Sequence, residues 1–85
     1  MALAERAPYS RIVRDPRVHG GEPTVRGTRV PVRVIVVAWR GEPEMPAMLQ
    51  AYPRLTEADI VEALAFYREH QAEIDARIEA QLTEG

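Results

Sequence analysis

Proline and glycine residues divide this chain into short segments, and their positions limit its secondary structure more than any other feature. All but one of the seven prolines and five glycines lie before residue 54. Proline fixes φ and lacks a backbone donor, while glycine permits left-handed backbone, so each tends to interrupt a regular element. We therefore expect several short elements up to residue 53 and one long element after it.

The N-terminal part predicts a small β portion at residues 10–30, preceded by a loose tail at residues 1–9. Ile12 and Val13 are followed by Asp15-Pro16, a pattern typical of a short strand and its stop. Residues 19–23 read HGGEP and predict a loop. Residues 24–30 read TVRGTRV and predict two short extended arms that turn at Gly27.

Residues 31–41 are ambiguous between strand and helix. Their many β-branched residues favour a strand, whereas Val32, Ile35, Val36 and Trp39 fall on one face of a helix. Pro31 suits a first helical turn and Gly41 a helix end, so the flanking residues favour a helix. A second short helix is expected at residues 46–52, between two prolines.

The third helix should begin with a capping pair, Thr56 and Asp59, and continue to about Leu82. About 26 residues at about 1.5 Å each span roughly 39 Å, whereas a compact chain of this size has a radius of gyration of about 12 Å. The end of this helix is therefore expected to overhang the core. Residues 31–69 would form a three-helix unit, and residues 70–85 would form an extension that contacts a second copy.

Seven positions of the long helix, five of them apolar, follow the spacing of a helix–helix seam. They are Ile60, Leu64, Tyr67, Gln71, Ile74, Ile78 and Gln81. From this seam we predict a homodimer, with Trp39, Tyr67, Ile74 and Ile78 at the contact. The alternative is that Ile60, Leu64 and Tyr67 are simply core residues and the remainder of the helix frays in water.

Charge is distributed unevenly between the two halves of the chain. Residues 1–40 hold eight of the eleven basic side chains and three acids, whereas residues 41–85 hold three bases and ten acids. Every base is arginine, which suits bidentate contact with phosphate or carboxylate, although a GC-rich genome produces the same bias. The overall formal charge of −2 hides this asymmetry.

The composition argues against several classes of protein. A chain of 85 residues without cysteine is expected to be one domain with neither disulfides nor thiolate sites, and it lacks the apolar stretch of a signal peptide or membrane span. We therefore expect a cytoplasmic protein. Two histidines far apart, a single serine and no phosphate-binding loop predict that it is not an enzyme and has no metal or cofactor.

Four blocks of sequence resemble a known family. They are DP at residues 15–16, GGEPTVRGTRVPV at 20–32, Gly41, and YPRLTEADIVEALAFY at 52–67. Over roughly residues 10–70 the chain is similar to the bacterial domain-of-unknown-function family four-three-three. The usual Ser or Thr cap of the second helix is replaced here by EPEMP, so the start of that helix is expected to be shifted or irregular.

The resemblance implies an α+β fold that is mostly α, with a small N-terminal β element followed by a helix-turn-helix-like unit of three helices. It also implies a role as the antitoxin of a VapBC-type toxin–antitoxin pair, whose toxin is a PIN-like ribonuclease. The alternative is a protein-interaction module that binds no nucleic acid.

Such an antitoxin has two possible partners, the PIN-like toxin and the DNA of its own promoter. Arginines near the predicted turn are the candidate binding residues for both. Carboxylates at residues 57, 59 and 62 would repel phosphate from the third helix, so DNA contact would come mainly from the β portion and first helix. The same side chains could enter the carboxylate-lined site of a PIN-like nuclease. The candidates are Arg11, Arg14, Arg26, Thr28, Arg29 and Arg33. The alternative is that Thr28 bonds locally and the arginines are only solvated.

Overall fold

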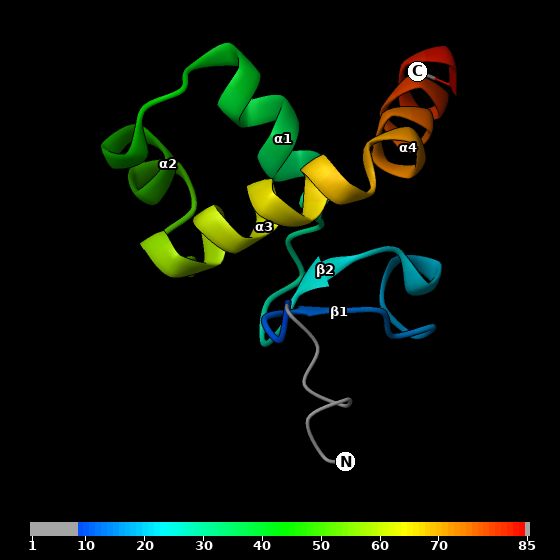
Figure 1. Ribbon diagram of the computed structural model, residues 1–85, viewed down its shortest axis with the longest axis horizontal. Coiled ribbons are helices and arrows are strands. Elements are labelled where there is room, and N and C mark those ends of the chain that lie inside the picture. Colours follow the sequence, from blue (N-terminus) through cyan, green and yellow to red (C-terminus); the bar gives the residue numbers. More distant parts are fainter. Residues whose placement is uncertain (1–8, 85) are drawn as a thin grey trace.

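The computed structural model describes residues 9–84, in which helices predominate and a small two-stranded sheet precedes them (Figure 1). The strands are β1, Ile12–Val13, and β2, Thr24–Val25, with a single 3-10 turn at His19–Gly21 between them. The helices are α1, Val32–Gly41, α2, Met45–Ala51, α3, Glu57–Glu69, and α4, Gln71–Glu84. The predicted α+β class, mostly α, is confirmed. Residues 1–8 of the predicted tail lie outside the described residues.

The β portion forms where the sequence predicts it. β1 and β2 pair antiparallel, with Ile12 opposite Val25 and Val13 opposite Thr24. After β2 the chain turns at Gly27, whose φ of 79° is strained for other residues, and returns so that Pro31 bridges to Thr24. The two extended arms around Gly27 are therefore confirmed.

The ambiguous segment after this turn is helical, as predicted. Val32, Ile35 and Val36 of α1 are buried along one face, and Trp39 on the same side is half-buried. α2 begins at Met45, one residue before the predicted start, and its N-cap Glu44 makes no side-chain capping hydrogen bond. The absent Ser or Thr cap thus coincides with a slightly shifted helix start.

α3 begins with the predicted capping box. The Asp59 amide donates to the Thr56 hydroxyl at 3.1 Å, and the Thr56 amide donates to the Asp59 carboxylate at 2.9 Å. Each bond satisfies a backbone N–H that the first turn of a helix leaves without a partner. The start of α3 is therefore fixed by local residues.

The prediction of one continuous helix from Thr56 to about Leu82 is wrong. The helix is interrupted at His70, where φ is −130° and ψ is 36°, and α4 then leaves in a new direction (Figure 1). The His70 ring stacks on Phe66 at a centroid distance of 4.0 Å, and its Nδ1–H donates to the Phe66 carbonyl at 3.0 Å. These contacts stabilise a break that neither proline nor glycine marks.

Because of this break, α4 packs on the chain's own core instead of overhanging it. Ile74, predicted to contact a second copy, is 0% exposed within a single chain, so its burial requires no partner. Ile78, Trp39 and Tyr67 are partly buried against the same core. The seam spacing marked Ile74 and Ile78, and both pack against the core of the same chain, where α4 contacts α1.

One hydrophobic core joins the sheet to all four helices. Its buried members are Val25, Val32, Ile35, Val36, Met48, Leu55, Ile60, Ala63, Phe66 and Ile74. Tyr9, assigned to the tail, also contacts this core through an edge-on contact with Phe66 at 5.5 Å. Within residues 9–84, no helix has the length and hydrophobicity to cross a membrane.

Candidate functional site

Ion pairs between the basic N-terminal half and the acidic C-terminal half use several of the predicted binding arginines. The Arg11 guanidinium donates to Asp59 at 3.2 Å, and the Arg11 amide donates to the Glu62 carboxylate at 2.6 Å. Asp59 is mostly buried and also caps α3. Arg11 therefore fastens β1 to the start of α3.

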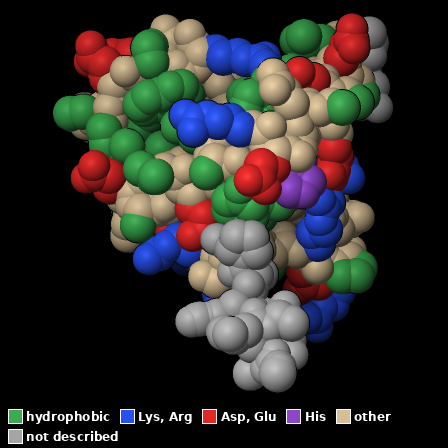
Figure 2. Space-filling view, in the orientation of Figure 1, with side chains coloured by type: hydrophobic (Ala, Val, Ile, Leu, Met, Phe, Trp, Pro, Cys, Tyr) green, Lys and Arg blue, Asp and Glu red, His purple; other side chains and the backbone are tan. Residues whose placement is uncertain are grey.

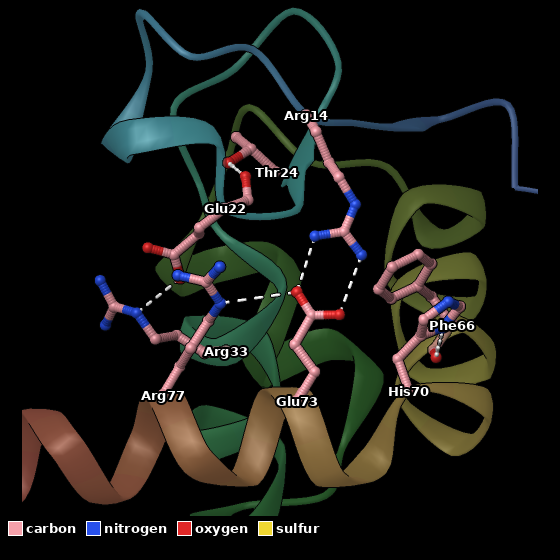
Figure 3. Close-up of polar contacts among 8 residues, drawn as sticks. All are labelled: Arg14, Glu22, Thr24, Arg33, Phe66, His70, Glu73 and Arg77. Carbon is pink, nitrogen blue, oxygen red and sulfur yellow. Dashed lines mark hydrogen bonds and ion pairs between the residues drawn. The ribbon is translucent and has the colours of Figure 1, made fainter.

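Arg14 makes a bidentate pair with Glu73 of α4 (Figure 3). The two hydrogen bonds measure 2.6 and 2.9 Å, and the guanidinium lies 5.7 Å from the centre of the Phe66 ring. Hydrogen bonding by Arg14 is the largest cause that lowers the pKa of Glu73, and Arg77, 3.6 Å away, adds to this effect. Arg14 thus connects the β portion to α4.

Arg33 is held by a nearly buried carboxylate. Its Nε–H donates to Glu22 at 2.6 Å, and a further hydrogen bond joins it to Gln81 of α4. Glu22 precedes β2, and the Thr24 hydroxyl donates to its carbonyl at 2.9 Å (Figure 3). Like Arg11 and Arg14, Arg33 has a structural partner within the chain.

Arg26 and Arg29 differ from the other predicted arginines. Both are exposed on the turn around Gly27, and neither guanidinium forms an ion pair within the described part of the chain. The Thr28 hydroxyl donates to the Val25 carbonyl at 2.9 Å and accepts from the Val30 amide at 3.0 Å. Thr28 therefore bonds locally, and its role is to fix the turn that presents the two arginines.

A surface hollow of about 490 Å³ lies beside this turn. We call it the arginine hollow, and its lining residues are Val18, Gly27, Thr28, Arg29, Val30 and Arg54. Arg54 comes from the turn between α2 and α3, and it donates to the Gly27 carbonyl at 3.5 Å, a weak bond. His19 Nε2–H donates to the Arg29 carbonyl at 2.9 Å. The backbone of the turn therefore accepts hydrogen bonds from His19 on one side and from Arg54 on the other.

The sequence prediction missed Arg54. Residues 27 and 54 are far apart in the chain, and only the packing of the α2–α3 turn against the β portion brings them together. The available signal was that Arg54 is one of three bases in an otherwise acidic half. Arg29 and Arg54 line the arginine hollow and Arg26 lies on the same turn, and none of the three has a carboxylate partner in the described residues.

The chemistry of this surface favours an anionic partner. Guanidinium groups form bidentate, charge-assisted hydrogen bonds with carboxylates and phosphates. Val18 and Val30 add apolar walls, which suit the short aliphatic stem of an Asp or Glu side chain. Among residues 9–84 there is no cluster of three His, Asp or Glu side chains that could hold a metal ion.

The exposed face of α3 adds a second constraint on the partner. In its first two turns the exposed side chains are Glu57, Ala58 and Val61. None of them can donate a hydrogen bond to a base edge or neutralise a phosphate, which are the two contacts that a DNA-reading helix supplies. The other two carboxylates of these turns, Asp59 and Glu62, face Arg11.

Comparison with known proteins identifies the family. The family model described as "Protein of unknown function (DUF433)" matches residues 12–67. A crystal structure of a DUF433 member protein from Anabaena variabilis superposes with a TM-score of 0.70 at 30% identity, covering 92% of this chain and 73% of that one. No curated protein matches the chain. The family match spans well over half of the chain and includes the Gly27 turn and most of α3, so this chain belongs to the DUF433 family.

Proposed function

We propose that this protein is an antitoxin-like component of a VapBC-type pair, which acts in the cytoplasm by binding and neutralising a PIN-like ribonuclease. The observation that carries the proposal is the contrast among the arginines. Arg11, Arg14 and Arg33 are paired within the chain, whereas Arg29 and Arg54 line the arginine hollow, Arg26 lies on the same turn, and none of these three has a carboxylate partner in the described residues.

A nuclease of this kind gathers carboxylates around a divalent metal, so it offers the negatively charged partners that the arginines of the hollow lack within their own chain. Inserted guanidinium groups would replace metal or substrate at those carboxylates. The turn is suited to insertion because hydrogen bonds from Thr28 and His19 hold its backbone in one conformation. A held turn loses less conformational entropy on binding than a flexible one.

Binding to promoter DNA is the second candidate activity. Arg26, Arg29 and Arg54 could contact phosphates, but the first two turns of α3 expose an acid, an alanine and a valine. Phosphate contacts without base contacts give affinity with little sequence specificity. We therefore favour the protein partner, and the alternative of an interaction module without nucleic-acid binding shares the same surface.

The test is a paired assay on the Arg26→Ala/Arg29→Ala variant. The partner is a PIN-like ribonuclease, sought first among the genes next to this one, and inhibition of its RNA cleavage is measured beside fluorescence anisotropy on the promoter fragment. We expect inhibition to be lost while any DNA binding is unchanged. Arg17→Ala, which removes an exposed arginine outside the hollow, is the matched control and should inhibit like the parent.

The opposite result would support DNA binding. If the variant still inhibits the ribonuclease but binds the promoter more weakly, with the slope of log affinity against log salt reduced by about two units, the arginines contact phosphates. Absence of any PIN-like gene nearby, together with no DNA binding, would leave the interaction module as the better description.

A further inference from the structure

A second hollow lies on a different surface, between α1 and α3. It has a volume of about 210 Å³ and is lined by Val36, Trp39, Arg40, Leu64, Tyr67 and Arg68. We call it the tryptophan hollow. Apolar cavities of about 150 Å³ accept a benzene-sized group, so this hollow has room for one large apolar side chain. Figure 2 shows apolar side chains gathered over the helices, with arginine side chains lying among them.

Two arginines, Arg40 and Arg68, lie on the rim of the tryptophan hollow, and Asp75 offsets the charge of Arg40. Arg40 uses Nη2 to donate to the Tyr67 hydroxyl at 2.6 Å and to Asp75 at 3.0 Å, and its side chain is half exposed. Arg68 is exposed and forms no ion pair within the described residues. An occupant that matches this site has an apolar side chain flanked by negative charge.

The C-terminal end of α4 has this chemistry. Leu82 is 75% exposed, the most exposed large hydrophobic side chain in the described part of the chain. Residues 78–84 contain two glutamates and no base. The last turn of α4 has no basic residue to offset the partial negative charge of its terminal carbonyls, which arginines from elsewhere would stabilise.

Leu82 cannot fill the tryptophan hollow of its own chain. It borders α1 beside Arg33, Val34 and Val37, whereas the hollow uses Val36, Trp39 and Arg40 of the same helix. At 3.6 residues per turn these two sets lie on different sides of α1. The complementary helix end must therefore come from another molecule.

We propose that two copies of this chain associate by docking the Leu82 end of α4 into the partner's tryptophan hollow, with Arg68 facing the acidic helix end. Reciprocal docking uses both hollows and both helix ends, so the assembly closes at two copies. This interface differs from the seam predicted from sequence, since Ile74 is internal. It is also separate from the arginine hollow and does not depend on the proposed function.

The experiment measures mass by analytical ultracentrifugation across micromolar concentrations, with the emission of Trp39, the only tryptophan, as a report from inside the hollow. The parent should approach twice its 9.6 kDa mass, with a shift of Trp39 emission on association. Leu82→Lys and Arg68→Glu should each weaken association by at least about tenfold. The variant that carries both substitutions should recover part of it, because the introduced ammonium and carboxylate groups would attract each other across the interface.

Two control variants test whether the loss of association is specific to the tryptophan hollow. Arg54→Glu makes the same charge change outside this hollow, and Val37→Ser alters the apolar groove between α1 and α4. Both should associate like the parent. A monomeric parent, an unchanged dimer in either single variant, no recovery in the double variant, or equal loss in either control would overturn the proposal.

Discussion

Replacement of Ile74 by alanine tests whether α4 belongs to the core of a single chain. Ile74 lies one turn after the break at His70, and its side chain is 0% exposed without any second copy. An Ile-to-Ala change in a core costs about 2–5 kcal/mol, because transfer energy is lost and a cavity remains. If the free energy of unfolding falls by about 3 kcal/mol, the unfolding temperature of a domain of this size falls by roughly 12–24 °C.

The assay is urea and thermal unfolding followed by circular dichroism at two protein concentrations. Because the burial is within one chain, the difference between the parent and Ile74→Ala should be the same at both concentrations. Ile74→Val provides a graded variant, expected to cost about 0.5–1.5 kcal/mol. Val61→Ala, at an exposed position of α3, is the control and should change stability by no more than about 0.5 kcal/mol.

Two results would refute this reasoning. A loss below about 1 kcal/mol in Ile74→Ala would mean that α4 contributes little to the core, contrary to the buried position. A loss that appears only at high protein concentration would mean that Ile74 is covered by a second copy, as the seam spacing in the sequence predicts.

Two further predictions concern the β portion and its attachment. Glu73→Gln should destabilise the protein most above the ordinary glutamate pKa of about 4.3, because Arg14 lowers the pKa of Glu73 in the folded state and this contribution is lost as the pH falls through that lowered pKa. Urea unfolding at neutral and acidic pH measures the difference from the parent, with the exposed Glu42→Gln as control; a difference that does not shrink in acid would contradict the assignment. Gly27→Ala should cost about 1 kcal/mol because φ is +79°, although its new Cβ would meet no atom within 4 Å. Gly41→Ala, at the end of α1 without a positive φ, should be neutral or stabilise by up to about 1 kcal/mol, and equal effects of the two substitutions in urea unfolding would exclude a backbone origin.

Local elements of the fold follow from residues that are close together in the sequence. The turn at Gly27, the helical state of residues 32–41 and the capping box of Thr56 and Asp59 were all predictable, because each depends on φ preferences or hydrogen bonds within a few positions. The same local signals did not indicate the break at His70. At that break the His70 ring stacks on Phe66 only four positions earlier, but the new direction of α4 buries Ile74 in a core that only the folded chain assembles.

The positive charge of the candidate site was predictable from the sequence, but the residues that form the site were not. The sequence showed a basic first half, yet it could not show which arginines have carboxylate partners: Arg14 pairs with Glu73, 59 positions away, and Arg11 with Asp59, 48 positions away. Nor could it place Arg54 beside Gly27. The charge of each side chain is a property of the residue alone, whereas its neutralisation depends on which surfaces meet when the chain folds. Sequence therefore determined that this protein carries a basic turn before its most apolar helix, and only the tertiary structure decided that Arg26, Arg29 and Arg54 are the arginines around it that have no carboxylate partner among residues 9–84.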